Sequence, residues 1–200
     1  MVFNGYNVLV NPNKRGEIMP TKNKTRETVL LGLMTALLCI MAPFSVPLPG
    51  MIPISLATLA IYCCTYLIGL RRAAICYFAY LSLGCVGLPV FSGFTGGAAR
   101  LLGPTGGYFL GYFAIILCEG WALKRFPNSL SMHIAGMVSG TIICYILGTA
   151  WLCFIQQIGF AAGLAAGVLP FIVGDALKII AVSVTAPVIR SRLEKAGLLP

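Results

Sequence analysis

Charged residues are scarce in this sequence, and acidic residues are the scarcest of all. Only 10% of the 200 residues are charged, and Asp and Glu together number 5. A soluble globular domain carries about 25% charged residues, because its surface must stay in water. With 58% hydrophobic residues, the chain is also too apolar to be intrinsically disordered. The composition therefore excludes both classes and predicts an integral membrane protein in contact with a lipid bilayer.

Several motifs for catalysis and metal binding are missing as well. The chain has no Gly-Lys dipeptide, which excludes a Walker A phosphate-binding loop, and its GMVSG segment has the wrong spacing for a serine-hydrolase elbow. It has a single His, and its 8 Cys fall within apolar runs without a C-x-x-C pair. We interpret these cysteines as small buried hydrophobic residues. We therefore expect no catalytic residue, metal or cofactor in this chain.

Six apolar stretches predict membrane-spanning helices, because a bilayer core needs about 20 residues per helix. They cover residues 28–43, 54–70, 73–89, 107–123, 130–155 and 164–189. We therefore expect an all-α integral membrane protein with one six-helix domain over residues 19–200. Residues 1–18 are polar and lack a helical period, so we expect either an extension before a natural start at Met19 or a disordered tail.

Basic residues mark one side of the predicted bilayer arrangement. Twelve of the 14 lie before the first stretch, between the second and third, between the fourth and fifth, or after the sixth. With six spans all of these connections are on the same side, and the positive-inside rule makes that side cytoplasmic, with both termini inside. The net charge of +9 thus reflects topology, and we expect no nucleic-acid partner.

Two of the charges that topology does not explain lie together in the last span. Asp175 and Lys178 are three residues apart and therefore share one helix face. Burying one charge in hydrocarbon costs at least about 2.5 kcal/mol. The two residues form either an internal ion pair that fixes helix packing or a site for a polar ligand. We favour the site, because ionisable groups inside membranes usually serve function.

Glu119 and His133 lie near the predicted cytoplasmic ends of their spans. Glu119 precedes Lys124 by five residues, so we expect it to pair with Lys124 or Arg125 at the membrane interface. His133 begins the fifth span, and we expect a hydrogen-bonded interfacial histidine rather than a ligand-binding one.

A glycine-rich segment between the third and fourth spans carries another unexplained charge, Arg100. Glycine backbone, here including Gly96 and Gly97, can approach a ligand closely. Three aromatic residues frame the segment: Phe91, Phe94 and Tyr108. Flexible linkers rarely contain so many aromatic residues, and an Arg in this setting suits a carboxylate or a phosphate. A flexible loop with one solvated Arg remains the alternative.

Proline and small residues add two further predictions. Four prolines within residues 42–59 forbid a continuous helix there, so the segment is either a stiff cover over an outer cavity or a plain connector. Three pairs of small residues are spaced for close helix contact: Gly32 with Ala36, Gly107 with Gly111, and Gly136 with Gly140. Internal packing is the simplest interpretation of all three pairs, and the first pair could also contact a partner protein.

Four segments together resemble one known family. GLPVFSGFTGG, GPTGGY and PFIVGDALK, in this order, and VPLPGMIPISLATL before them resemble the BioY family. Its members are the biotin-specific substrate-binding (S) components of energy-coupling factor (ECF) transporters, and the resemblance extends over about residues 28–194. It implies a six-helix protein of the bacterial cell membrane that captures biotin from outside. Delivery inward would require a transmembrane coupling protein and two ATPase subunits, which consume the ATP.

The resemblance also implies roles for particular residues. Gly32 and Ala36 match the small-residue motif with which S components dock on the coupling protein. Biotin has a carboxylate, an apolar chain with a thiolane ring, and a ureido ring that carries two N–H donors and one carbonyl. Asp175 would accept the ureido N–H groups, and either Lys178 or Arg100 would meet the carboxylate. The expected cavity walls are Phe91, Phe94, Tyr108, Trp151 and Phe171.

Two other functions remain open at the level of sequence. One is an S component or small transporter for a different vitamin-like anion. The other is a membrane enzyme using Asp175 and Lys178 as acid and base, although the chain offers no nucleophile or metal cluster to support it. Oligomeric state, affinity and transport without the coupling module are not determined by these motifs.

Overall fold

A computed structural model describes residues 21–46 and 52–197. The predicted extension at residues 1–18 lies outside these residues, as does the middle of the proline-rich connection. The described residues form eight helices: α1 (Thr21–Met41), α2 (Ala57–Ile68), α3 (Leu70–Cys85), α4 (Ala98–Leu102), α5 (Gly106–Arg125), α6 (Leu130–Gln156), α7 (Phe160–Gly167) and α8 (Leu169–Lys195). Each of the six predicted apolar stretches therefore contains one principal helix.

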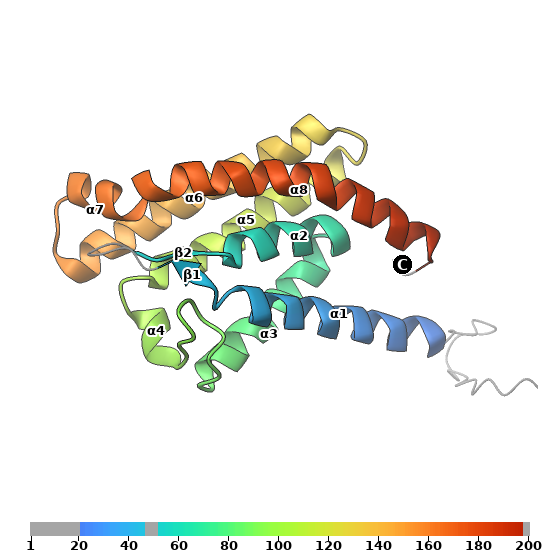
Figure 1. Ribbon diagram of the computed structural model, residues 1–200, viewed down its shortest axis with the longest axis horizontal. Helices are drawn as coiled ribbons and strands as arrows, with labels where there is room; N and C mark the ends of the chain where they lie inside the picture. Colours follow the sequence, from blue (N-terminus) through green and yellow to red (C-terminus); the bar gives the residue numbers. More distant parts are fainter. Residues whose placement is uncertain (1–20, 47–51, 198–200) are drawn as a thin grey trace, which may run out of the picture.

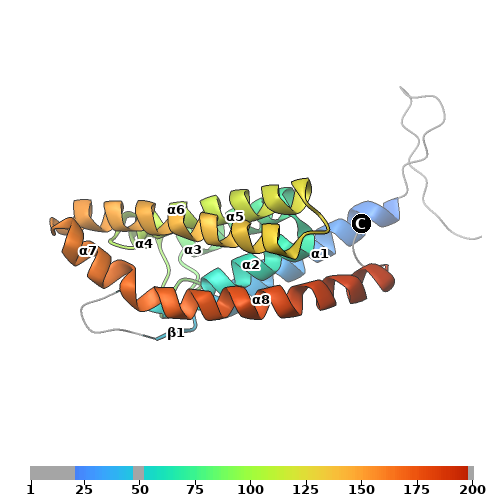
Figure 2. The same cartoon turned by 90° about the horizontal axis from the view of Figure 1, so that it is seen from above.

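The helices form an elongated bundle whose two ends differ (Figures 1 and 2). The start of α1, the connection between α5 and α6, and the end of α8 lie at one end. The short helices α4 and α7 lie at the other end, together with the two strands. Lys124 and Arg125 end α5, and Arg192 and Lys195 lie in the last turn of α8. The fold thus gathers basic residues from distant parts of the sequence at one end of the bundle.

Helix length separates the spans into two groups. Three segments of the described chain are long and apolar enough to cross a membrane: Gly106–Arg125, Leu130–Gln156 and Phe160–Lys195, the last comprising α7 and α8. By contrast, α2 has 12 residues and is largely buried inside the bundle. At the rise of an α-helix this corresponds to about 18 Å, which is shorter than a bilayer core of about 30 Å.

The described part of the proline-rich connection contains two short strands, which agrees with the prediction that no continuous helix runs through it. Strand β1 (Ser45–Val46) pairs in antiparallel fashion with β2 (Ile54–Ser55), so that Ser45 lies opposite Ser55. This pairing delays the start of α2 to Ala57. The helix then ends at Ile68, because Gly69 adopts a φ of +78° that continues neither α2 nor α3.

Glycines bring α5 and α6 into close contact. A Cβ atom at Gly111 would collide with Cys144, and a Cβ atom at Gly140 would collide with the backbone of Ile115. Gly136 is packed in the same way against Ala122. Internal packing is therefore confirmed for the two later small-residue pairs. The first pair differs, since Gly32 and Ala36 lie on the exposed face of α1.

Candidate functional site

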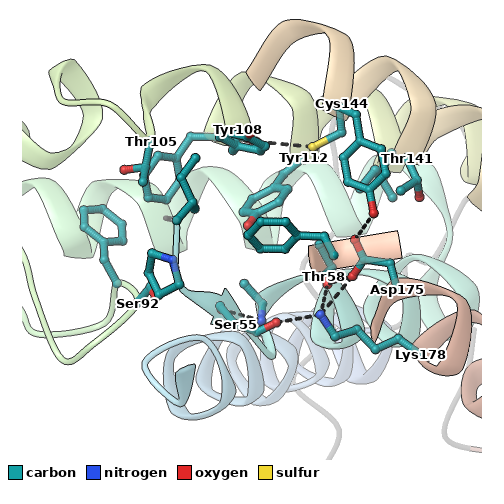
Figure 3. A pocket seen from close by; sticks show the side chains of 18 of the residues that line it. Ser55, Thr58, Ser92, Thr105, Tyr108, Tyr112, Thr141, Cys144, Asp175 and Lys178 are labelled. Carbon is teal, nitrogen blue, oxygen red and sulfur yellow. Dashed lines mark hydrogen bonds and ion pairs between the residues drawn. The ribbon is translucent and has the colours of Figure 1, made fainter. Parts of the chain in front are cut away.

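A cavity with about 760 Å³ of empty space lies among α2, α5, α6 and α8, and residues 91–105 contribute to its wall (Figure 3). Most of its lining is aromatic or aliphatic, with a few polar groups toward its ends. Six of the predicted site residues line it: Phe91, Arg100, Tyr108, Phe171, Asp175 and Lys178.

Lys178 lies at one end of the cavity and uses all three of its N–H donors. Its Nζ donates to Asp175 Oδ1 at 2.9 Å, to Thr58 Oγ1 at 2.9 Å and to the backbone oxygen of Ser55 at 2.8 Å. These partners come from α8, from the first turn of α2 and from β2. The ammonium is buried, and an ammonium has three donors, so its hydrogen bonding is complete within the protein.

Asp175 completes the same network. Its Oδ1 also accepts a hydrogen bond from Thr58 Oγ1 at 3.2 Å, and its Oδ2 accepts one from Tyr145 OH at 2.7 Å. Asp175 is buried, faces the cavity and is ion-paired to Lys178. The two interpretations of this pair therefore coexist, because the ion pair forms and also contributes to the lining of a cavity. The second lone pair of Oδ2 leaves room for a donor from a ligand.

Arg100 provides a cation at the other end of the cavity. Its Nε donates to Thr95 Oγ1 at 3.0 Å, and its backbone oxygen is 3.5 Å from the hydroxyl of Thr105. In Figure 3, Thr105 and Ser92 lie across the cavity from Asp175 and Lys178. Among the described residues, no carboxylate forms a salt bridge with Arg100. Its guanidinium is therefore a charge that a ligand anion would complement.

Aromatic rings form the walls between these two ends. Tyr108 stacks with Phe171 at a ring-centroid distance of 6.5 Å and donates its hydroxyl to the backbone oxygen of Gly167 at 2.8 Å. Phe91 packs against Phe109 at a centroid distance of 4.9 Å. Such rings offer an apolar surface to a ligand, while their mutual packing fixes their positions.

Several lining residues were missed in the sequence. The polar ones include Thr58 and Tyr145, which bond directly to Asp175. Tyr112 follows Tyr108 by four residues and thus extends the same face of α5 into the cavity. The spacing could have indicated Tyr112 as a lining residue, because Tyr108 was predicted to line the cavity and a residue four positions later on a helix lies on the same face.

Two of the predicted aromatic walls lie outside the cavity. Phe94 is 60% exposed and packs edge-on against Phe44 with a centroid distance of 5.5 Å. Trp151 packs over the start of α5, and its Nε1 donates to the backbone oxygen of Gly103 at 2.9 Å. Both rings are thus engaged in holding loops in place. Neither the position of Phe94 within the glycine-rich segment nor the aromatic character of Trp151 revealed the direction in which the ring points.

Gly96 and Gly97 are also outside the cavity lining, and their role in this structure is to shape the loop. Gly96 presses against the backbone oxygens of Gly87 and Leu88, where a side chain would collide. Gly97 precedes α4 with a φ of +97°, and its N–H donates to the backbone oxygen of Gly84 at 2.7 Å. The close approach expected between glycine backbone and ligand is here an approach between two backbone segments.

The prediction that Glu119 pairs with Lys124 or Arg125 is wrong. Glu119 is 0% exposed, and within the described residues neither carboxylate oxygen has a hydrogen-bond partner. Lys124 and Arg125 are exposed, because five or six residues of an α-helix place a side chain well away from the starting face. His133 forms the expected hydrogen bond, with Nε2 2.7 Å from the backbone oxygen of Phe126, and its side chain is buried in the first turn of α6.

Comparison with known proteins shows similarity to the BioY family and to biotin transporters. The sequence profile of the BioY family matches residues 17–195. The biotin transporter BioY of Thermotoga maritima is 33% identical over 85% of this chain and 96% of its own length. A probable biotin transporter BioY of Pyrococcus horikoshii is 34% identical over 86% of this chain and 98% of its own.

A solved structure shows the same fold. It is described as the S-component for biotin from an ECF-type ABC transporter. The two folds agree with a TM-score of 0.80 at 29% sequence identity, over 86% of this chain and 95% of the solved one. Profile, relatives and fold agree over nearly the same residues, and the chain belongs to the BioY family.

Proposed function

We propose that this chain binds biotin with high affinity and imports it as the membrane-embedded S component of an ECF-type ABC transporter. The observation that carries the proposal is a cavity with a carboxylate–ammonium pair at one end and a free guanidinium at the other. The similarity to biotin transporters and to a solved biotin S-component supports this ligand. The family consists of transporter components, so the role is transport and not catalysis.

The two ends of the cavity suit the two ends of biotin. Asp175 can accept a ureido N–H through the second lone pair of Oδ2, beside the hydrogen bond from Tyr145. Arg100 then meets the ligand carboxylate, because its guanidinium has unused donors whereas all three N–H bonds of Lys178 are engaged. The aromatic walls between them cover the apolar chain and the thiolane ring.

The orientation we propose has six membrane spans, both termini in the cytoplasm and the cavity loading from outside the bacterial cell. The positive-inside rule supports it, since basic residues gather at the end of the bundle opposite α4 and the strands. Short helix α2 completes its crossing together with the extended residues before it. The cavity draws Ser92, Arg100 and Thr105 from the opposite, less basic end.

Docking on the transmembrane coupling protein would use α1. A Cβ atom added at Gly32 would have no neighbouring atom within 4 Å, and Ala36 lies one turn further along the same exposed face. Small residues let two helices approach closely in lipid. Two ATPase subunits of the complex would consume the ATP, and this chain itself requires no cofactor.

The test of the ligand assignment pairs one variant with one altered ligand. Isothermal titration calorimetry on the purified protein measures biotin and biotin amide, which lacks the negative charge, against wild type and Arg100→Ala. Wild type should bind biotin at least tenfold more tightly than the amide, about 1.4 kcal/mol. Arg100→Ala should lose that preference, while Arg125→Ala, outside the cavity, should keep it.

Three outcomes would contradict parts of this proposal. Equal losses for both ligands in Arg100→Ala would remove Arg100 from carboxylate recognition. A preference for the amide in the wild type would place the ligand the other way round. No biotin binding by the wild type, with binding of another vitamin-like anion, would assign the cavity to that anion.

A further inference from the structure

A second hollow lies on the outer surface of α5 and α6, beside the first residue of α3. It encloses about 1090 Å³ of open space and is apolar, with Leu70, Leu117, Trp121 and Met132 among its lining residues. Trp121 is 61% exposed and forms one wall. This groove shares no lining residue with the cavity that we assign to biotin.

The groove exists because small residues form its floor between larger ones. Gly136 of α6 packs against Ala122 of α5, and Ala135 is exposed beside them. Lining residues on α6 run from Met132 to Ser139, which corresponds to about 10 Å along the helix. The groove therefore extends along the helices, in the direction that an extended hydrocarbon chain beside them would take.

Basic residues stand at the mouth of the groove. Leu117, Trp121 and Arg125 are spaced four residues apart on α5, so the face that lines the groove leads directly to Arg125. The guanidinium of Arg125 lies 5.7 Å from the ring centroid of Phe126, and that ring packs edge-on against Trp121 at 6.2 Å. Lys124 is three residues beyond Trp121 and exposed.

A further cation comes from α3. Arg71 directly follows Leu70, which lines the groove, and Arg71 is exposed. The salt bridges of the described residues use Arg72, Lys178 and Arg190. Arg71, Lys124 and Arg125 are therefore not neutralised by a carboxylate within the described part of the chain.

We propose that this groove binds an anionic phospholipid of the membrane. One acyl chain lies in the groove along α5 and α6, and the phosphate lies against Lys124, Arg125 and Arg71. Charge complementarity selects the headgroup, because basic clusters at the ends of membrane helices attract anionic lipids. Trp121 is placed where aromatic residues favour the boundary between hydrocarbon and headgroups. This site is separate from biotin transport and does not depend on which ligand fills the inner cavity.

Trp121 makes the site directly observable. The chain has 2 Trp, and in a Trp151→Phe background Trp121 reports alone. The protein is reconstituted in phosphatidylcholine vesicles, and brominated phosphatidylglycerol or brominated phosphatidylcholine is titrated in to quench the fluorescence. We expect half-maximal quenching by the phosphatidylglycerol at a mole fraction at least fivefold lower than for the phosphatidylcholine.

Matched variants separate a specific site from general contact with lipid. Replacing Lys124 and Arg125 together by Ala should abolish the difference between the two lipids, whereas replacing Arg192 and Lys195 at the end of α8 should leave it unchanged. Ala135→Phe fills the groove and should weaken quenching by the anionic lipid. The same change at Ala150, exposed elsewhere on α6, should not.

Two results would overturn the proposal. Equal quenching of the wild type by both lipids would show that lipid contacts Trp121 without selection. Loss of a dimer, or of assembly with the coupling protein, specifically in Ala135→Phe would assign the groove to a protein helix instead. Biotin binding measured on the same samples should be unchanged in every variant, which separates failure of this site from failure of the transport function.

Discussion

The ammonium of Lys178 joins three parts of the chain that are far apart in sequence. Its acceptors are the Ser55 backbone in β2, Thr58 in α2 and Asp175 on its own helix. Breaking a buried ion pair by removing one partner costs about 3–5 kcal/mol, because the remaining charge is left uncompensated. This pair therefore both positions the start of α2 against α8 and shapes the polar end of the cavity.

We predict that Asp175→Asn and Lys178→Ala each weaken biotin binding at least tenfold, about 1.4 kcal/mol. Asn keeps the shape of Asp175 but loses the charge that holds Lys178, and Ala removes the ammonium altogether. Calorimetry on purified variants measures the effect. Ser183→Ala is the matched control, since this buried hydroxyl on α8 bonds to Ile179 of its own helix. Unchanged affinity in both site variants would remove the pair from the binding site.

Tyr145→Phe tests the same network with less risk to the fold. It removes the 2.7 Å hydrogen bond to Asp175 Oδ2 and leaves the ion pair in place. A hydrogen bond to a charged group contributes about 1.5–3 kcal/mol, so we expect thermal unfolding of the variant at a lower temperature than wild type. An unchanged unfolding temperature would contradict a stabilising role for this bond.

Glu119 is buried without a hydrogen-bond partner among the described residues. An ionised carboxylate in such a place is costly, so a neutral side chain of the same shape should be tolerated there at least as well. We predict that Glu119→Gln, which has the same shape and no charged form, unfolds at the same temperature as wild type or at a higher one. Glu119→Asp is the control, because it leaves a gap of one methylene and should lose about 1 kcal/mol. A larger loss for Gln than for Asp would indicate a partner for the carboxylate.

A residue of the candidate site could be predicted from the sequence when its type is rare in an apolar chain. Asp175 and Lys178 were identified because charges are few and their spacing places them on one face. Thr58 was not, because a threonine in an apolar helix is ordinary and its partner is 117 residues away. Phe94 and Trp151 were assigned to the wrong place because aromatic character does not specify which way a ring points.

At the scale of helices, apolar length predicted where each segment lies but not where each one ends. Strand pairing between residues 45–46 and 54–55 shortens α2 at its start, and Gly69 stops it at its end. Neither feature has a hydropathy signal. Helix α4, with five residues, follows the positive φ of Gly97 and places Arg100 against the cavity. The position of such a short helix is determined by the loop around it and not by the apolar length of its own residues.

The exposed face of α1 leads to a prediction about partner docking. Gly32→Leu should leave biotin affinity unchanged and abolish assembly with the coupling protein, because a Leu side chain fits in open space here but prevents close helix contact. Leu in place of Gly also favours the helix by about 1 kcal/mol, so lost assembly would not reflect unfolding. Calorimetry and co-purification with the coupling module measure the two effects.

A control on another helix makes this test specific. Ala150→Leu enlarges an exposed small residue on α6 and should affect neither biotin binding nor assembly. Normal assembly and uptake by Gly32→Leu would exclude α1 as the docking helix.

At the scale of the whole molecule, the basic residues and the mouth residues of the cavity, such as Arg100, lie toward opposite ends of the bundle. Basic residues gather where α5 and α8 end, whereas Arg100 and the residues around it line the cavity toward the end that holds α4. The six-span topology that we propose accounts for this separation, because an odd number of crossings would place the basic connections on both sides. Under this proposal, the positions of the basic residues determine both the loading side and the partner side.

Reporter fusions test this orientation. Alkaline phosphatase is active outside the cytoplasm and green fluorescent protein fluoresces inside it. We predict an active phosphatase fused after Gln157, beyond the end of α6, and an inactive one fused after Asn128, between α5 and α6. Green fluorescent protein fused after Pro200 should fluoresce, since the basic residues that precede it favour the cytoplasm. Phosphatase activity after Asn128 would place the basic end of the bundle outside the cytoplasm, and the cavity would then face the cytoplasm and could not load from outside.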